Sequence, residues 1–149
     1  MTASAESMAT ATCFEELRAW QLSEEMKEKV FELTGRERVA RDRSFCDDIQ
    51  RSARSAPANI AEGFGWFEPK PNAHYVSIAK ASLEETKNHI LDAFKRKHVS
   101  EEERDQLLDL TTRALKTTTR YLRYLRSCKK APTAKAADSR NPSGTKNGT

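Results

Sequence analysis

The sequence is poor in the residues that interrupt helices. It contains only 5 glycines and 5 prolines in 149 residues, and several of these lie in the last twenty. The middle of the chain is therefore nearly free of helix breakers, and the strict alternation typical of strands is nearly absent from it. These deficits argue against a sheet-based fold and predict long helices.

Cysteines and long apolar runs are scarce as well. Cys13, Cys46 and Cys128 are odd in number and widely spaced, which argues against a disulfide framework and against a zinc site. No apolar run approaches the roughly 20 residues that span a bilayer, and residues 1–13 lack the basic start and apolar middle of a signal peptide. We therefore expect a soluble protein of the reducing cytoplasm, with no membrane partner.

The motifs of common enzymes and metal centres are missing. The chain has no Gly-x-Ser-x-Gly, no Cys/His catalytic signature and no phosphate-binding glycine loop. A di-iron bundle needs paired Glu-x-x-His motifs, but His74, His89 and His98 have no glutamate three residues before them. We expect a non-enzymatic protein without metal or cofactor, although a site assembled from distant residues would leave no such motif.

The positive charge is concentrated near the C-terminus. The formal net charge is +4, from 26 basic and 22 acidic residues. Five of the basic residues and one of the acidic residues fall within 129–149, so residues 1–128 carry 21 of each sign. Affinity for a polyanion must therefore come from charge segregation within the folded part or from the tail.

Composition divides the chain into three parts. Residues 1–12, rich in Ala, Ser and Thr, have the composition of a disordered leader. Residues 13–128 carry the apolar pattern of one folded domain, and residues 129–149 have the composition of a disordered basic tail.

The first two helices of the domain are bounded by glycines. The first is expected to end near Thr34, and the second to run from about residues 42–44 to Gly63. An aromatic, proline-bounded loop is expected to follow over residues 64–71.

The third and fourth helices have the clearest apolar periodicity. Ser100, with Glu103 three residues later, forms a capping box that begins the fourth helix after a break near residues 97–99. In both helices small or apolar residues recur every three or four positions, as along a coiled-coil seam. These positions are Val76, Ala79, Leu83, Thr86, Ile90 and Ala93, then Leu108, Thr111, Leu115, Thr118, Leu122 and Leu125. Four long helices with short connections predict an all-α, up-down-up-down four-helix bundle.

The fourth helix has a second apolar stripe, formed by Leu107, Ala114 and Tyr121. It is wider than one antiparallel neighbour needs, so either the core is broad or another subunit covers the stripe. We expect self-association.

The second helix carries a proline and a strip of polar residues. Pro57 removes a backbone hydrogen bond, so a kink or local rearrangement is expected near it. Asp48, Ser55, Asn59 and Glu62 lie on one strip and offer a ligand site. We favour the alternative, a hydrogen-bonded polar seam between helices or subunits.

The fourth helix separates its charges along its length, acidic in its first turns and basic in its second half. Arg113, Lys116, Arg120 and Arg123 form a stripe with three-four-three spacing, which is longer than the reach of the helix dipole. Such a stripe predicts contacts to nucleic-acid phosphates with little sequence preference, and the basic tail would extend it. The alternative is a solvated face partly paired with acidic residues of a neighbouring helix.

Three aromatic residues offer stacking surfaces for unpaired bases: Trp66, Phe67 and Tyr124. We favour the alternative that they close the end of the bundle.

Four segments carry a resemblance to a known family, namely residues 14–21, 49–53, 55–65 and 78–85. Over roughly residues 14–128 the chain resembles the bacterial 23S rRNA intervening-sequence protein family. The Asn-Ile-Ala-Glu-Gly run after Pro57 is the most specific element of the resemblance.

The resemblance implies a four-helix bundle, and no catalytic residue carries over with it. Because the family includes the accessory variability determinant of diversity-generating retroelements, it also implies a ring-shaped homopentamer, nucleic-acid binding and a reverse transcriptase as partner. Arg51 matches the family pattern, whereas Gln50 and Trp66 stand at positions that are often basic. Arg54 is expected to compensate, which makes Arg51 and Arg54 secondary candidates for nucleic-acid binding.

The leading hypothesis is a non-enzymatic, oligomeric bundle that binds RNA or DNA through the basic stripe. The alternatives are an accessory subunit whose main partner is a reverse transcriptase, and a purely structural assembly protein.

Overall fold

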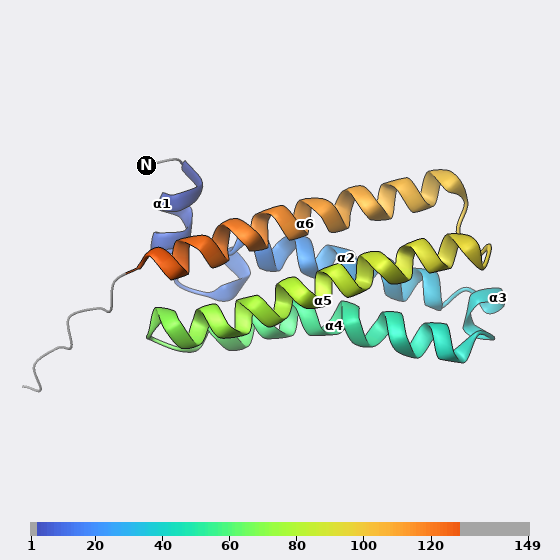
Figure 1. The fold of residues 1–149 in the computed structure, drawn as a ribbon, viewed down its shortest axis with the longest axis horizontal. Coiled ribbons are helices and arrows are strands. Elements are labelled where there is room, and N and C mark those ends of the chain that lie inside the picture. Colours follow the sequence, from blue (N-terminus) through green and yellow to red (C-terminus); the bar gives the residue numbers. More distant parts are fainter. Residues whose placement is uncertain (1–2, 129–149) are drawn as a thin grey trace, which may run out of the picture.

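The computed structural model describes residues 3–128, and these residues contain helices and no strand (Figure 1). The elements are α1 (Ala3–Thr10), the 3-10 turn η1 (Phe14–Glu16), α2 (Arg18–Thr34), α3 (Glu37–Ala40), α4 (Arg43–Phe64), α5 (Pro69–Lys95) and α6 (Glu101–Ser127). The prediction of an all-α fold is confirmed. The expected basic tail, residues 129–149, lies outside the described residues.

The four long helices α2, α4, α5 and α6 lie side by side along the long axis of the molecule (Figure 1). Helices α2 and α5 each pack against both α4 and α6, so α4 and α6 lie diagonally across the core from each other. One end carries the connection at residues 65–68 and the last turn of α6; the other carries α3 and the connection at residues 96–100 (Figure 1). We call these the 65–68 end and the 96–100 end.

Most expected helix boundaries agree with the structure. Helix α2 ends at Thr34, and α4 begins at Arg43 and continues as one helix through Pro57. Helix α5 begins at Pro69, so the connection between α4 and α5 is shorter than the loop expected over residues 64–71. A proline suits this position because the first turn of a helix needs no backbone donor.

The capping box at the start of α6 is present. The Glu103 backbone amide donates to Ser100 Oγ at 3.1 Å, and the Ser100 amide donates to Glu103 Oε2 at 3.2 Å. Arg36, which follows α2, pairs with the same carboxylate at 3.1 Å. The Arg36 hydrogen bond, followed by that of the Ser100 amide, lowers the pKa of Glu103. These contacts fix where α6 starts relative to α2.

The interior contains two clusters of buried side chains. The larger includes Met26, Ile49, Leu83 and Ile90, and extends toward the 96–100 end. The smaller lies toward the 65–68 end and consists of Leu17, Ala19, Ile60, Ala73, Val76, Ala79, Tyr121, Leu122 and Leu125. Removing apolar surface from water stabilises a fold by about 25 cal/mol per Å². These two clusters are therefore the main source of the stability of the bundle.

Small residues let α4 and α5 approach each other closely, and hydroxyl groups join the two helices. Thr86 Oγ1 donates to Ser52 Oγ at 2.9 Å, and the hydroxyl oxygens of Ser55 and Ser82 are 2.7 Å apart. Because these groups are wholly or partly buried, their hydrogen bonds offset the cost of removing them from water.

The second apolar stripe of α6 is covered by the chain itself. Ala114 and Tyr121 are buried, and Leu107 is partly buried against the larger cluster. Tyr121 also accepts a hydrogen bond of 3.0 Å from Asn72 Nδ2 on α5. The reason is geometric: α6 packs on both α2 and α5, so it needs an apolar face wider than one neighbour requires. The broad-core alternative therefore accounts for this stripe.

The segment expected to be a disordered leader, residues 1–12, contains α1. Met8 and Ala11 pack against the smaller cluster, so part of this segment covers the core near the 65–68 end. Its low hydrophobicity concealed this contact in the sequence, since a single methionine and small residues give no helical period.

Candidate nucleic-acid interface

The basic stripe of α6 lies on the surface. Arg113, Lys116, Arg120 and Arg123 are all exposed, while Ala114, Thr118 and Leu122 on the opposite side of α6 are buried in the core. Burial of that apolar side fixes the rotation of the helix and so directs the cations outward. From Arg113 to Arg123 the stripe is about 15 Å long at the rise of an α-helix.

Most of the stripe is free of internal ion pairs. Arg113 Nε lies 3.1 Å from Asp109 Oδ2, one turn earlier on the same helix. Lys116, Arg120 and Arg123 form no ion pair with any residue in the described range 3–128. The pairing with a neighbouring helix that the alternative includes is therefore not seen for these three cations among residues 3–128, and their exposure fits both a solvated face and a binding surface.

Two further cations extend the stripe. Arg126, three residues after Arg123, is exposed in the last turn of α6. Arg18, at the start of α2, lines a small hollow together with Arg120 and with Met8 of α1. The basic composition of the second half of α6 signals Arg126 in the sequence, but only the packing of α2 beside α6 brings in Arg18.

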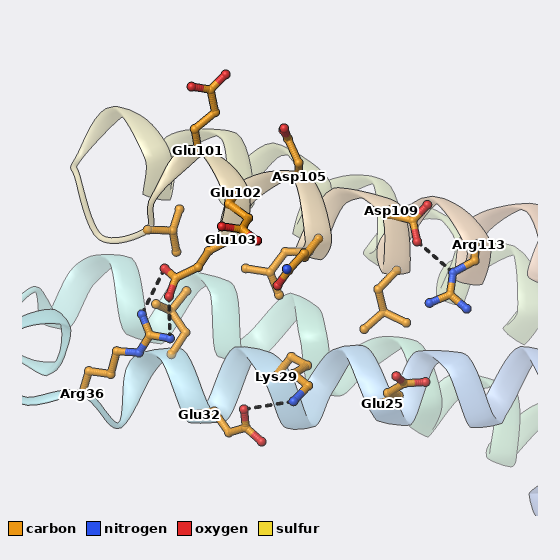
Figure 2. Close-up of a pocket in the computed structure, with 15 residues that line it drawn as sticks. Glu25, Lys29, Glu32, Arg36, Glu101, Glu102, Glu103, Asp105, Asp109 and Arg113 are labelled. Carbon is orange, nitrogen blue, oxygen red and sulfur yellow. Dashed lines mark hydrogen bonds and ion pairs between the residues drawn. The ribbon is translucent and has the colours of Figure 1, made fainter.

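The first half of the same exposed face is acidic. Glu101, Glu102, Asp105 and Asp109 are exposed, and a groove between α6 and α2 collects these carboxylates with others from α2 (Figure 2). Arg113, the first residue of the basic stripe, also lines this groove and pairs with Asp109 (Figure 2). A phosphate backbone would be attracted to the half toward the 65–68 end and repelled by the other half.

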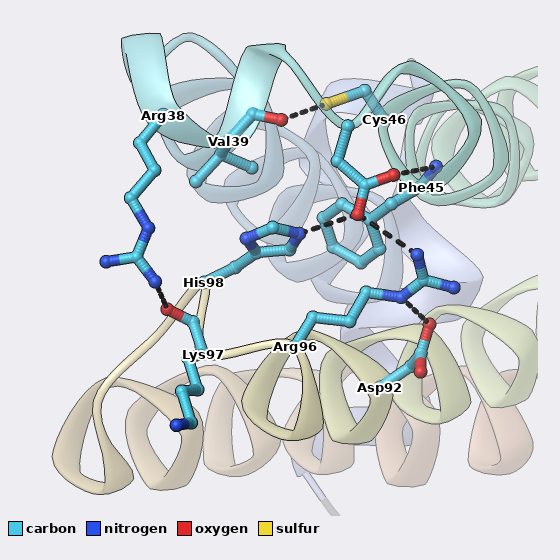
Figure 3. Close-up of polar contacts among 9 residues, drawn as sticks. Arg38, Val39, Phe45, Cys46, Asp92, Arg96, Lys97 and His98 are labelled. Atoms are coloured by element: carbon cyan, nitrogen blue, oxygen red, sulfur yellow. Dashed lines mark hydrogen bonds and ion pairs between the residues drawn. The ribbon is translucent and has the colours of Figure 1, made fainter.

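A polar network holds the 96–100 end (Figure 3). Asp42 Oδ2, at the start of α4, lies 2.8 Å from His98 Nε2 and 3.0 Å from an Arg96 guanidinium nitrogen. The hydrogen bond from His98 is the largest cause that lowers the pKa of Asp42, and the Phe45 amide and Arg96 act in the same direction. Beside it, Cys46 Sγ donates to the Val39 carbonyl at 3.3 Å, and burial raises the pKa of its thiol.

The secondary candidates Arg51 and Arg54 lie on α4, across the core from α6. Both are exposed. Arg51 pairs with Asp48 at 2.6 Å, and the Arg54 guanidinium lies 6.0 Å from the centre of the Phe31 ring. The structure therefore does not bring these two arginines together with the α6 stripe.

The aromatic candidates fall into two groups. Phe67 is wholly exposed, with a relative accessibility of 102%, and Trp66 is 49% exposed. The Trp66 ring stacks on Tyr75 with a centroid distance of 6.3 Å and an interplanar angle of 20°. Tyr124 is partly buried against the smaller cluster, where it helps close the bundle, whereas Phe67 closes nothing.

The polar strip of α4 divides between the seam and the surface. Ser55 and Asn59 join the seam, with Asn59 Nδ2 donating to Ser55 Oγ at 3.0 Å. Asp48 pairs with Arg51, and Glu62 is exposed. The structure therefore gathers only part of the strip between α4 and α5.

The histidines do not cluster. His74 is exposed near the start of α5, His89 lies 3.5 Å from Glu85, and His98 contacts Asp42. Across the described residues, no three His, Cys, Asp or Glu side chains are grouped to hold a metal ion. None of the helices described here is both long and apolar enough to cross a bilayer.

Fold and surface together define a class of protein: an all-helical protein with a charge-segregated helix exposed along one edge. The family model of the 23S rRNA-intervening sequence protein matches residues 15–120, which is more than half of the chain. The chain belongs to this family, and the resemblance noted in its sequence is confirmed. A comparison with curated proteins found no match.

Proposed function

We propose that this protein is a non-enzymatic, oligomeric, up-down-up-down four-helix bundle that binds RNA or DNA through the basic half of α6. The observation that carries the proposal is the row of exposed cations from Arg113 to Arg126, of which Lys116, Arg120, Arg123 and Arg126 have no ion-pair partner among residues 3–128.

The chemistry of this surface suits phosphates and not base edges. The cations lie on the convex outside of a helix, and long flexible side chains there reach a backbone without entering a groove in a fixed register. Contacts of this kind give affinity with little sequence preference, and each releases condensed counterions. Binding is therefore expected to weaken steeply as salt rises.

Self-association, with a homopentamer as the form that the family suggests, remains part of the proposal. Because Ala114 and Tyr121 are buried within the chain, the apolar stripe of α6 no longer supports it. The exposed Ile78, Leu91 and Phe94 of α5 offer apolar surface for a second copy instead. Repetition of the α6 stripe around a ring would multiply its affinity for one strand.

Two alternatives make different predictions. An accessory subunit of a retroelement would bind a reverse transcriptase, and a reverse transcriptase gene with a template repeat beside this gene would favour it. A purely structural assembly protein would be unaffected by loss of the α6 cations.

The proposal is tested by fluorescence anisotropy with 20-nucleotide RNA and DNA strands and duplexes at several salt concentrations, with light scattering for mass. The test variant replaces four α6 cations with glutamine: Arg113→Gln, Lys116→Gln, Arg120→Gln and Arg123→Gln. We expect the wild-type protein to bind with a steep salt dependence, and the variant to lose up to about four units of the log–log slope.

A control variant removes the same charge from exposed positions outside α6: Arg41→Gln, Arg43→Gln, Lys95→Gln and Lys97→Gln. It is expected to retain most of the affinity, since those cations lie away from the stripe. Equal losses in the two variants would mean that only net charge matters, and absent or salt-independent binding by the wild type would refute the proposal.

A further inference from the structure

We infer that the connection at residues 65–68 is a stacking site for unpaired bases, and that the preferred ligand of this protein is single-stranded nucleic acid. This inference rests on the proposed function and adds the strand state to it. The strand would place its phosphates on the basic half of α6 and its bases on Phe67 and Trp66.

The first support is an aromatic ring that the fold does not use. Phe67 is wholly exposed, so it contributes no buried apolar surface to the core. Trp66 beside it is half exposed, and its stacking on Tyr75 holds the indole at a fixed orientation. Trp66 is thus ordered before it meets a flat partner, which lowers the entropy lost on stacking, and Phe67 offers its whole ring.

The second support is the position of these rings next to the cations. Glu68, Lys70 and His74, at the start of α5, line one groove together with Leu125 and Arg126 at the end of α6. Phe67 directly precedes Glu68 in the chain, so the connection that carries the exposed rings adjoins this groove. Figure 1 shows the connection between α4 and α5 at the same end of the molecule as the last turn of α6.

A single strand fits this arrangement better than a duplex or a membrane. Strand-binding proteins combine a cationic track for the backbone with aromatic rings on which bases stack. In a duplex the base faces are already stacked and unavailable to Phe67. Membrane-surface segments combine apolar side chains with a cationic face. Here the acidic Glu68 adjoins Phe67, Lys70 lies at the start of α5, and the other cations run back along α6 for about 20 Å at helical rise.

The experiment compares three ligands of equal length on the full chain: a 12-nucleotide oligouridylate, an abasic strand with the same phosphates, and a duplex. Affinities are measured for the wild-type protein and for Phe67→Ala. Phe31→Ala is the matched control, because Phe31 is an exposed phenylalanine near the end of α2 that has no part in the proposed binding or self-association surfaces.

Trp66 supplies a second readout. The chain has 2 tryptophans, and Trp20→Phe leaves Trp66 as the only one. Stacking of a base on the indole would quench its fluorescence, whereas phosphate contacts alone would not.

We expect the wild type to bind oligouridylate at least about fivefold more tightly than the abasic strand, from one stacked base. Phe67→Ala should abolish this difference and leave abasic and duplex binding unchanged, while Phe31→Ala should preserve it. Oligouridylate, and not the abasic strand, should quench Trp66.

Several results would overturn the inference. Equal affinity of the wild type for oligouridylate and the abasic strand would do so, as would equal weakening of all three ligands by Phe67→Ala. Phe67-dependent sedimentation with phosphatidylserine vesicles, or Phe67-dependent self-association without nucleic acid, would assign the loop to another partner. If binding still depends on the α6 cations in these cases, the proposed function stands and only the stacking site fails.

Discussion

Gly63 shows how one residue sets the distance between two helices. A Cβ atom at this position would lie 2.6 Å from Asn72 Oδ1 and 3.0 Å from both the Asn72 carbonyl oxygen and Tyr75 Cβ. Two of these three atoms belong to the α5 backbone or directly adjoin it, so they cannot move without moving the helix. Asn72 is also the residue that donates to Tyr121, which links this contact to α6.

Gly63→Ala is therefore expected to destabilise the protein by about 1–3 kcal/mol through overpacking. The free energy of unfolding from urea titration measures the effect. Gly65→Ala is the control, because its Cβ would meet only the Glu62 carbonyl oxygen, at 3.3 Å. Equal stability of Gly63→Ala and wild type would show that α5 can shift at no cost.

At the scale of the element, the exposed face of α6 has an acidic first half and a basic second half, and Asp109 is the last acidic residue before the basic half. Its pairing with Arg113 holds the first cation of the stripe. Asp109→Asn is expected to tighten nucleic-acid binding and to steepen the salt dependence by up to about one unit of slope, because Arg113 is released to a phosphate. Asp47→Asn makes the same change on the exposed face of α4 and should have a much smaller effect. Unchanged affinity in Asp109→Asn would show that the bound strand does not contact Arg113.

Asp42 joins the start of α4 to the connection between α5 and α6, and its charge makes that junction pH-dependent. The pKa of its carboxyl is lower in the folded protein than its ordinary value of about 3.9. The unfolded chain therefore takes up this proton first, so the stabilisation is fully present above about pH 4 and is lost as the pH falls through the folded value.

Asp42→Asn retains an acceptor for the Phe45 amide but loses the charge that faces His98 and Arg96. We expect the difference in unfolding free energy between wild type and variant to be largest above about pH 4 and to shrink toward pH 2. Urea titrations across this range measure it. A difference that stays constant with pH would show that the charge of Asp42 contributes nothing.

At the scale of the whole molecule, the two arginine candidates on α4 test whether a nucleic-acid strand contacts only the α6 face or wraps around the bundle. Arg51 and Arg54 lie across the core from the α6 stripe, so Arg51→Gln with Arg54→Gln is expected to change affinity less than twofold when one strand lies along α6. Anisotropy titration of the double variant is the measurement. A loss comparable to that from two α6 cations would indicate a strand that contacts both faces or adjacent protomers.

The sequence predicted the long helices well because their signals are local. The helix boundaries depend on residues only a few positions apart, namely the capping box of Ser100 and Glu103, the glycine after Thr34 and Gly63 near the end of α4. The apolar seam of α6 likewise repeats every three or four residues. Which face is covered depends on neighbours that periodicity does not identify. The sequence therefore left open whether the core or another subunit covers Tyr121. Spacing also could not predict that Arg18 lies beside Arg120 or that Phe67 is fully exposed.

The opposed charges of the α6 face give the molecule a polarity. Residues 1–128 carry as many acidic as basic residues, so a distant polyanion exerts little net pull on them and acts mainly as a torque. The bundle would turn until its cationic end leads, and the carboxylates around Glu101 would point away. Each copy bound to a strand would then approach in one orientation and leave its acidic end open to the surrounding solution.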